Sequence, residues 1–359
     1  MKITPLHSIH EASGAKMGEF AGYEMPLYYA DGVLKEHEWV RAHAGVFDVS
    51  HMGQLLMFGK GSVQVLEKLT PSSFQNLKPF SAKYTVMTNP EGGIVDDLIV
   101  TRLSEDVFFV VINAGNKYRN IDWINHHLTP TVEVLPLEER ALIAVQGPQA
   151  EAALHREFGI DLSELGYMQL VEGMIEGANV FISRLGYTGE DGFEISIPDH
   201  KAEELWGRLV QNPEVKPIGL AARDSLRLEM GYCLYGHDID ATTTPIEADL
   251  RWVMSKDNKT FIGADKVGLP KRKRVGIKLT DKGIAREGAE IRSKDDKKIG
   301  VLTSGTFSPT LKESIGQGYV DIMDAGIGTE VFVNVRGNNL AATIVEMPFI
   351  KPKTKAAKK

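Results

Sequence analysis

The sequence predicts an α+β protein of several domains that ends in an all-β barrel or sandwich. At 359 residues the chain exceeds what one hydrophobic core usually serves, so two or three domains are expected. Up to about residue 231, strand-like alternation is interleaved with segments whose apolar residues recur at helical spacing. Beyond about residue 265 only short strand-like runs and glycine turns remain, which is typical of a separate all-β unit.

The first half of the chain begins with a helix and continues as mixed strands and helices. Residues 33–45 space their apolar side chains at helical intervals, and we expect Gly45 to follow the helix C-terminus. Up to about residue 135, the strand-like segments are FDVSHMGQLLMFG, IVDDLIVTR and VFFVVINAG, and the helical ones are SVQVLEKLT and YRNIDWINHHL. Together they predict one α+β unit of ordinary domain size.

The segments that follow predict a strand, a helix, a hairpin and two further helices. ALIAVQG is strand-like, and PQAEAALHREFG is a helix with Pro148 in its first turn. ANVFISRLGYTGEDGFEISIP has the alternation of a β-hairpin, with its turn in YTGEDG. HKAEELWGRLVQ and IGLAARDSLRLEMG are amphipathic helices, the second ending at Gly231. The expected barrel strands are RVGIKLT, KIGVLTSG, IGQGYVDI, TEVFVNVRG and LAATIVEM.

Composition and charge argue against several classes of protein. The chain is 43% hydrophobic and 25% charged, and no run approaches the roughly 20 apolar residues of a membrane span. A formal net charge of −7 argues against general nucleic-acid binding. The basic segments 271–274 (KRKR) and 351–359 (KPKTKAAKK) are therefore expected to be a solvated linker and tail. The N-terminal segment shows no apolar or Arg-rich leader, and a cytoplasmic protein is expected.

Cysteine and histidine usage predicts neither a disulfide nor a metal site. Cys233 is the single cysteine, which leaves no partner for an intrachain disulfide and no second thiolate for zinc. Its surroundings, GYCLYG, favour packing over nucleophilic catalysis. The histidine pairs 7/10 and 126/127 lack a third ligand at a persuasive spacing, so no metal is expected.

Two carboxylates interrupt an apolar strand in NPEGGIVDDLIVTR, residues 89–102. Alternation places Asp97 on the face of Val95 and Asp96 on the face of Ile94, and both faces are apolar. A buried carboxylate is costly unless a specific group satisfies it. At least one of the two should therefore meet a partner, a turn amide or a ligand. Bonding to the backbone N–H groups of the glycine turn is the simpler of these alternatives.

A second group of charged residues lies beside apolar sequence. Glu194 sits within a strand-like segment between two apolar residues. Arg223 and Arg227 fall on one helical face by their i, i+4 spacing, with ion pairing to Asp224 or Glu229 as the structural alternative. Isolated carboxylates on strands and arginines on a helix, with tyrosines nearby in sequence, suit a planar, nitrogen-rich heterocycle.

A series of motifs in a fixed order carries a resemblance to a known family. They are TPLHSIHEASGAKMGEFAGYEMP, HAGVFDVSHMG, NPEGGIVDDLIVTR, VVINAGN, RLGYTGEDGFEISIP, GLAARDSLRLEMGYCLYGHDID, TTPIEADLRWVM, LTSGTFSPTLKESIGQGYV and the final MPF. From about residue 4 to about residue 350, the sequence closely resembles aminomethyltransferase, the T-protein of the glycine cleavage system.

The resemblance implies three domains in a cloverleaf around a central folate-binding opening. A discontinuous α+β domain would comprise residues 1–50 and 140–262, with a ferredoxin-like α/β unit inserted at 51–139. A C-terminal β-barrel would occupy residues 265–351, followed by a basic tail at 352–359.

The same resemblance implies a tetrahydrofolate-dependent enzyme. The family takes the aminomethyl group carried on the dihydrolipoyl arm of lipoylated H-protein, passes its one-carbon unit to tetrahydrofolate and releases ammonia. The products are 5,10-methylenetetrahydrofolate and reduced H-protein. The implied partners are H-protein and tetrahydrofolate as cosubstrate, with no metal, flavin, nucleic acid or membrane.

Residue roles follow from the motif matches. Asp97 matches the family's catalytic aspartate, whereas Asp96 is expected to be structural. Glu194 matches the glutamate that holds the pterin edge, and Arg223 matches the binding arginine of the GLAARD helix. Arg286 is expected near the lipoyl entrance. Expected pocket-lining residues are Asn113, Tyr84, Met52 and Arg227.

The sequence departs from the family pattern after MPF. Some members place there a tyrosine or arginine that contacts substrate, whereas this chain continues IKPKTKAAKK. A contact with the glutamate tail of folate would fall to Lys351 or Lys353, each a point charge rather than a guanidinium fork.

Other functions share this folate-binding fold. A tetrahydrofolate-dependent demethylase of a small sulfonium or methoxyl substrate would use the same pocket without H-protein, and is the alternative enzyme. A folate module of an amine oxidoreductase would sit beside a flavin domain, but no G-x-G-x-x-G unit occurs here. A non-enzymatic folate-binding iron–sulfur assembly factor usually carries a lysine-glycine-cysteine-tyrosine motif. The corresponding LEMGYCLYGHDID argues against that class.

Overall fold

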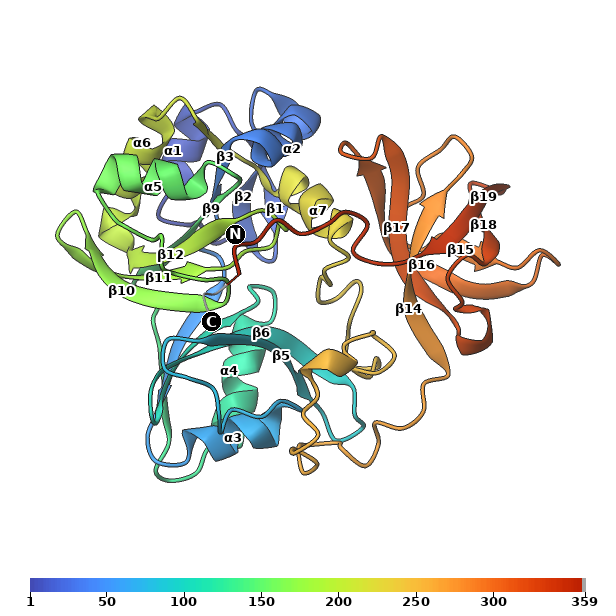
Figure 1. Cartoon of the computed structure of the whole chain (residues 1–359), viewed down its shortest axis with the longest axis horizontal. Helices are drawn as coiled ribbons and strands as arrows, with labels where there is room; N and C mark the ends of the chain where they lie inside the picture. The colour runs from blue at the N-terminus through green and yellow to red at the C-terminus, as the bar shows by residue number, and fades with distance from the viewer. Residues whose placement is uncertain (357–359) are drawn as a thin grey trace.

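The computed structural model of the chain describes residues 1–356 and contains two large sheets and a barrel. The sheets lie one above the other on one side of the molecule, and the barrel lies on the opposite side (Figure 1). The predicted α+β, multidomain fold class with a C-terminal barrel is confirmed.

The first sheet has six strands in the order β10-β11-β12-β9-β3-β13. All its neighbouring strands run antiparallel except β13, which is parallel to β3. The predicted hairpin is the antiparallel β11–β12 pair. The strands are β3 (Ala44–Asp48), β9 (Arg140–Gln146), β10 (Gln169–Ile175), β11 (Ala178–Arg184), β12 (Gly192–Pro198) and β13 (Val215–Pro217).

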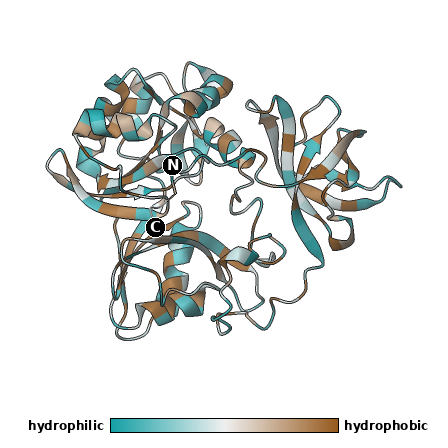
Figure 2. Ribbon diagram, viewed as in Figure 1, coloured by the Kyte–Doolittle hydropathy of each residue, from teal (hydrophilic) through white to brown (hydrophobic). Residues whose placement is uncertain are grey.

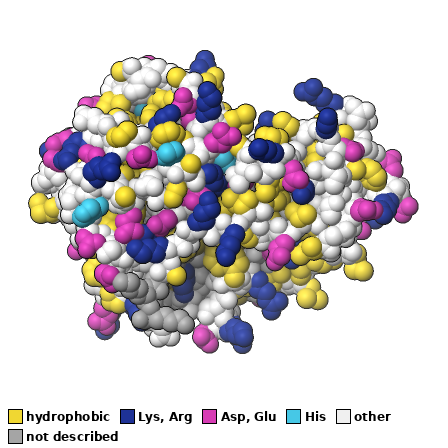
Figure 3. Space-filling view, turned by 45° about the horizontal axis from the view of Figure 1, so that its top comes forward, with side chains coloured by type: hydrophobic (Ala, Val, Ile, Leu, Met, Phe, Trp, Pro, Cys, Tyr) yellow, Lys and Arg dark blue, Asp and Glu magenta, His cyan; other side chains and the backbone are white. Residues whose placement is uncertain are grey.

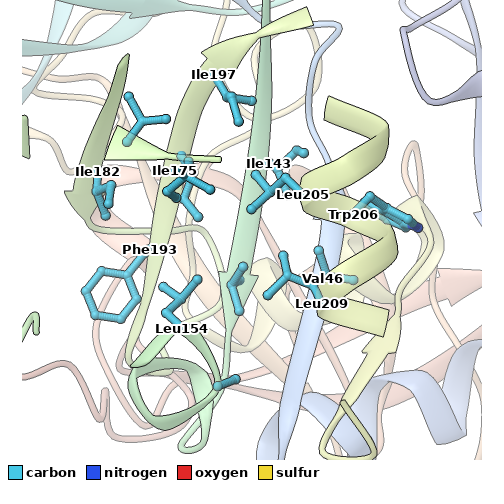
Figure 4. Close-up of a cluster of buried hydrophobic side chains, with 14 of the residues drawn as sticks. Val46, Ile143, Leu154, Ile175, Ile182, Phe193, Ile197, Leu205, Trp206 and Leu209 are labelled. Atoms are coloured by element: carbon cyan, nitrogen blue, oxygen red, sulfur yellow. The ribbon is translucent and has the colours of Figure 1, made fainter. Parts of the chain in front are cut away.

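Helices cover both faces of the first sheet. On one face lie α1 (His7–Ala12), α5 (Ala150–Phe158) and α6 (Ala202–Gln211). Figure 4 shows Leu205 and Leu209 of α6 directed toward Ile143 and Val46 of the sheet. The other face packs against α2 (Gly32–Ala42), α7 (Leu220–Glu229) and the second sheet. Figure 2 shows hydrophobic and hydrophilic segments on the same helices, as expected for amphipathic helices that cover a core.

The second sheet has five antiparallel strands in the order β5-β6-β7-β4-β8. Helices α3 (Ser62–Leu69) and α4 (Lys117–His126) bury their apolar faces against it. The strands are β4 (Gly53–Phe58), β5 (Ala82–Thr88), β6 (Ile94–Ser104), β7 (Val107–Ile112) and β8 (Glu133–Pro136). A separate two-stranded hairpin near the N-terminus, β1 (Lys16–Phe20) with β2 (Tyr23–Tyr28), was not predicted.

The C-terminal unit is a closed six-stranded antiparallel barrel in the order β14-β17-β16-β15-β18-β19, and pairing of β19 with β14 closes it. The short strand β15 was not predicted from sequence. The strands are β14 (Arg272–Leu279), β15 (Glu290–Arg292), β16 (Lys298–Ser308), β17 (Glu313–Asp321), β18 (Glu330–Val335) and β19 (Asn338–Val345). Three short 3₁₀ helices complete the elements: η1 (Asp199–Lys201), η2 (Arg251–Val253) and η3 (Ile322–Asp324).

The helix predicted for residues 33–45 ends before Gly45, which was expected to follow its C-terminus. Helix α2 stops at Ala42, and Gly45 lies inside β3. A Cβ at Gly45 would lie 2.6 Å from side-chain carbons of both Val40 and Ile218. The glycine therefore permits close packing against the strand, and the prediction that it follows the helix end is wrong.

Both basic segments are more ordered than expected. In KRKR, Arg274 is buried and donates hydrogen bonds to the carbonyl oxygens of Ala248 and Gly231, both at 2.8 Å. The C-terminal segment runs from the barrel back to the first sheet (Figure 1). There the Lys353 N–H donates to the Gly189 carbonyl at 2.8 Å. The prediction of a solvated linker is wrong for Arg274. In the tail, residues 351–353 are exposed as predicted, although the Lys353 backbone is bonded to Gly189, and residues 357–359 lie outside the described part of the chain.

Surface features agree with the mixed composition. Figure 3 shows basic and acidic side chains interspersed on the face in view. Among residues 1–356, no helix is both long enough and apolar enough to cross a membrane.

Candidate active site

Strand β6 contains a β-bulge one residue before its two carboxylates. The pairing of β6 with β5 skips Val95, so Val95 joins the buried cluster that contains Leu98 while Ile94 lies in a different cluster. A bulge shifts the alternation of side chains by one residue. The prediction that Asp96 shares a face with Ile94, and Asp97 with Val95, is therefore wrong.

Asp96 is fully buried and bound by three donors. Its Oδ1 accepts from Asn113 Nδ2 at 2.8 Å and from the Asp97 backbone N–H at 2.9 Å, and its Oδ2 accepts from Asn120 Nδ2. The donors are two asparagines and a strand amide rather than the amides of the glycine turn. Burial raises the pKa of Asp96, and the three hydrogen bonds oppose that rise.

Asp97 has fewer donors and a perturbed pKa. Its Oδ1 accepts from Asn113 Nδ2 at 2.6 Å, and its Oδ2 accepts from the Tyr84 hydroxyl at 3.0 Å. Burial first, and then the charge of Asp96, raise the pKa of Asp97 to about 7. At neutral pH this carboxyl can therefore either hold or release a proton, a property that suits a general acid–base group.

Tyr84 connects Asp97 to an exposed aromatic side chain. The Tyr84 ring stacks on that of Trp252 in η2, with centroids 5.5 Å apart and 23° between the ring planes. Trp252 is 67% exposed, so it presents a flat apolar surface at the edge of the site. The motif TTPIEADLRWVM contributes to the family resemblance, but no local pattern in it predicts that Trp252 lies at the site.

A small cavity between the two sheets reaches Glu194. Ile99, which lines the cavity, lies two residues beyond Asp97 on the same face of β6. Glu194 enters from β12 of the facing sheet, and burial raises the pKa of its carboxyl while the nearby charge of Arg223 opposes that rise. The other residues that line this cavity include Val111, Leu142, Phe181 and Ser183. The lining of this cavity thus includes Glu194 but not Asp97, which lies two residues before Ile99 on β6.

Arg223, which interacts with Glu194, has a buried hydrogen-bond donor without a partner among the described residues. Its guanidinium lies 4.7 Å from the centre of the Tyr187 ring, and its buried Nη1 has no hydrogen-bond partner among the described residues. Burial lowers the pKa of Arg223, although the nearby charge of Glu194 opposes this. A buried donor without a partner is costly, so it marks a place for a hydrogen-bonding ligand.

Arg227 has a different role from the one its position on the helix suggested. Its guanidinium donates to Asp238 Oδ2 at 2.5 Å, Ser304 Oγ at 2.8 Å and Asp224 Oδ1 at 2.9 Å. A fourth bond, at 2.9 Å, reaches the Tyr232 carbonyl. These partners occupy the guanidinium and tie α7 to the barrel, which matches the structural alternative.

Of the remaining expected site residues, one contacts Asp97 and two lie elsewhere. Asn113 contacts Asp97 directly, whereas Met52 is partly buried in the apolar cluster between the two sheets. Arg286 lies in the barrel, where its Nη1 donates to the Gly305 carbonyl at 3.1 Å. Among the described residues, no hydrogen bond or ion pair joins Arg286 to Asp97. Among residues 1–356, no group of three or more His, Cys, Asp or Glu side chains could hold a metal ion.

Sequence reasoning assigned no role to His51, which the structure places in an unusual environment. The side chain is buried between the rings of Phe20 and Tyr23, at centroid distances of 5.5 and 6.2 Å. Its Nδ1 has no hydrogen-bond partner in the described chain. Burial lowers the pKa of His51 to about 3, so the ring is neutral at physiological pH.

Comparison with known proteins supports the predicted family. Residues 6–258 match the model of the GCVT N-terminal domain, and residues 272–351 match the glycine cleavage T-protein C-terminal barrel domain. An aminomethyltransferase from Chloroherpeton thalassium is 42% identical over 359 residues, which cover 98% of this chain and 99% of the relative. One from Bacteroides thetaiotaomicron is 43% identical over 362 residues, covering 98% of this chain and 100% of the relative.

A solved structure shows the same architecture. The crystal structure of glycine cleavage system aminomethyltransferase T from Bartonella henselae superposes with a TM-score of 0.94 at 42% sequence identity. The superposition covers 99% of each chain. The predicted resemblance is confirmed, and the chain belongs to the glycine cleavage T-protein family of aminomethyltransferases.

Proposed function

We propose that the protein transfers the one-carbon unit of the aminomethyl group on dihydrolipoyl H-protein to tetrahydrofolate, with release of ammonia. Family membership supports this reaction class. The observation that carries the proposal is the cluster around Tyr187, which lies near the charge of Asp97 and under the guanidinium of Arg223, while Arg223 interacts with Glu194. It combines a carboxyl suited to proton transfer with groups suited to holding a polar heterocycle.

The residues fit a pterin. One edge of a pterin carries adjacent N–H donors, which a carboxylate can accept in parallel, and its carbonyl oxygen can accept from a guanidinium. Glu194 would take the donor edge, and the unsatisfied Nη1 of Arg223 would take an acceptor. Tyr84 and Asn113 would line the site while orienting Asp97. Trp252 offers a stacking surface next to Tyr84.

The proposed chemistry exchanges two bonds at one carbon. The methylene loses its bonds to the amino nitrogen and the lipoyl sulfur, and gains bonds to two folate nitrogens. The two protons on those nitrogens leave with ammonia and the thiol, so the exchange balances. Asp97, when ionised, stabilises the positive charge that develops on the carbon as the amine departs. When protonated it can give its proton to the leaving nitrogen.

The direct test is ammonia release from aminomethyl-loaded H-protein, with and without tetrahydrofolate. We expect strong folate-dependent release from the wild-type protein. Asp97→Asn should lower turnover about 100-fold or more while keeping most folate affinity, because it removes a positioned acid–base group without changing its shape. The control is Asp265→Asn, which should keep normal turnover, because Asp265 is exposed and its ion-pair partner among the described residues is the neighbouring Lys266.

Each other outcome has a clear meaning. Near-normal turnover of Asp97→Asn would remove this residue from the mechanism. Folate binding by the wild type without ammonia release would retain the folate site but discard H-protein as the donor. That result would favour the demethylase alternative, and sulfonium methyl donors would then be tested.

A further inference from the structure

Asp96 and Asp97 share one hydrogen-bond donor. The Nδ2 group of Asn113, directly after β7, lies 2.8 Å from Asp96 Oδ1 and 2.6 Å from Asp97 Oδ1. An amide nitrogen carries two hydrogens, so it can donate one to each carboxylate. The Asp97 backbone N–H also donates to Asp96, which further fixes the two residues relative to each other.

We propose that Asp96 is a positioning residue for the reaction: through the shared Asn113 amide and its own buried charge, it sets the orientation and the protonation of Asp97. This inference rests on the proposed function, in which Asp97 transfers a proton. It changes the interpretation of Asp96 from a structural carboxylate to one that acts through its neighbour. Asp96 itself is enclosed by the protein, so it does not need to touch substrate.

The two carboxylates differ in how well their ionised forms are stabilised. Asp96 accepts three hydrogen bonds from Asn113, Asn120 and a backbone amide. Asp97 accepts one from Asn113 and one from the Tyr84 hydroxyl. Hydrogen bonds from donors favour the charged form of a carboxylate, so the proton shared by such a pair belongs on Asp97.

The side chains facing Asp97 from other elements are neutral. Tyr84 comes from β5, Tyr187 from the β11–β12 turn and Cys233 from the segment after α7. Burial raises the pKa of each, to about 12 for the Cys233 thiol and well above the ordinary value for the Tyr84 phenol. None of these three carries a charge at neutral pH that would offset the negative charge of Asp96.

Positive charges near the pair act mainly on other groups. Arg119 of α4 lies next to Tyr235, whose pKa is raised by burial, lowered by Arg119 and raised by Asp96. Arg227 is bound to Asp238, and Arg223 faces Glu194. The charge of Asp96 is therefore the main electrostatic influence on Asp97 apart from burial itself, in agreement with the causes of its raised pKa.

The test is the pH dependence of single-turnover ammonia release in Asp96→Asn, a change that keeps the shape and removes the charge. The profile should shift to lower pH by at least about 1 pH unit, because adjacent interacting carboxyls perturb one another by that amount or more. The control is Glu105→Gln, an exposed carboxylate at the far end of the β6–β7 hairpin, and its profile should match the wild type.

A purely structural role predicts a different result. A folded Asp96→Asn protein with an unchanged profile would overturn the proposal, even if its melting temperature or turnover fell. Should the variant fail to fold, carbon-13 NMR titration of aspartate-labelled Asp96→Ser, compared with the wild type and assigned with Asp97→Asn, decides the question, because a serine hydroxyl can still accept from Asn113 but carries no charge. An Asp97 midpoint lower by at least about 1 pH unit in Asp96→Ser supports the proposal, and equal midpoints in the two proteins overturn it.

That titration needs no substrate, so it distinguishes failure of the proposed function from failure of the role proposed for Asp96. If the wild-type protein released no ammonia, the proposed function would fail while the titration still reported on the carboxyl pair. If the protein were active and the Asp97 midpoint were the same with and without Asp96, only the role of Asp96 would fail.

Discussion

Glu229→Gln should lower the free energy of unfolding by about 3 kcal/mol at neutral pH. Glu229 is the last residue of α7, is fully buried, and accepts hydrogen bonds from both α2 and the barrel. Its Oε2 lies 2.7 Å from Arg41 Nη2, 3.1 Å from His37 Nε2 and 2.9 Å from Thr310 Oγ1. Its Oε1 accepts from the Ser308 hydroxyl. Removing the charge weakens several contacts that hold the barrel to the first sheet.

The magnitude follows from the pKa of the carboxyl. Burial alone would raise it, but His37, Arg41 and Ser308 together lower the pKa of Glu229 from 4.5 to about 2. Each pKa unit corresponds to about 1.4 kcal/mol, so the ionised network contributes about 3 kcal/mol. Because the folded-state pKa lies below the unfolded value, this stability is present above about pH 4.5. It is lost as the pH falls toward about 2.

The assay is denaturant unfolding at pH 7, followed by tryptophan fluorescence. The matched control is Glu313→Gln, which removes one partner of an ion pair with Lys278 in which both side chains are 39% exposed. Exposed pairs contribute less than about 1 kcal/mol, so the control should change little. The difference between Glu229→Gln and wild type should also shrink on acidification below about pH 4.5. Equal effects of the two substitutions at pH 7 would refute this account of the network.

Two other substitutions probe the site and its surroundings. Glu194→Ala should weaken tetrahydrofolate binding by about 1–3 kcal/mol in calorimetry, the usual value of a lost charged hydrogen bond; unchanged affinity would make Glu194 structural. Gly93→Ala should lower the free energy of unfolding by about 3 kcal/mol, because a Cβ there would lie 1.8 Å from the Ala241 carbonyl oxygen. An unchanged free energy of unfolding for Gly93→Ala would show that the glycine turn can move away from the Ala241 carbonyl.

Local sequence was sufficient to predict most elements, because their patterns depend on near neighbours. Helix α7 shows this: its apolar residues recur at helical spacing, and Gly231 follows its end with a positive φ of 62°. Local sequence could not show that Arg223 and Arg227 have different roles. They lie one turn apart, yet Arg227 is bound by Asp238, which a tertiary contact brings to it from an irregular segment.

The bulge in β6 was unpredictable for a related reason. Nothing in IVDDLIVTR breaks the alternation of a strand, and the extra residue at Val95 appears only in its pairing with β5. The family resemblance identified Asp97 as the candidate acid–base residue without this detail. It could not identify the shared Asn113 donor, because hydrogen-bond geometry depends on the positions of β6 and β7 together.

The docked C-terminal segment has a consequence for how the protein is made in the cell. Lys353 donates its N–H to Gly189, two residues after Tyr187, and Tyr167 donates its own to the Lys355 carbonyl. These lysines follow every strand of the two sheets and the barrel in the sequence, so they are synthesised after all of those strands. The two sheets can therefore fold before this segment is synthesised, and its bonds to Gly189 and Tyr167 can form only afterwards.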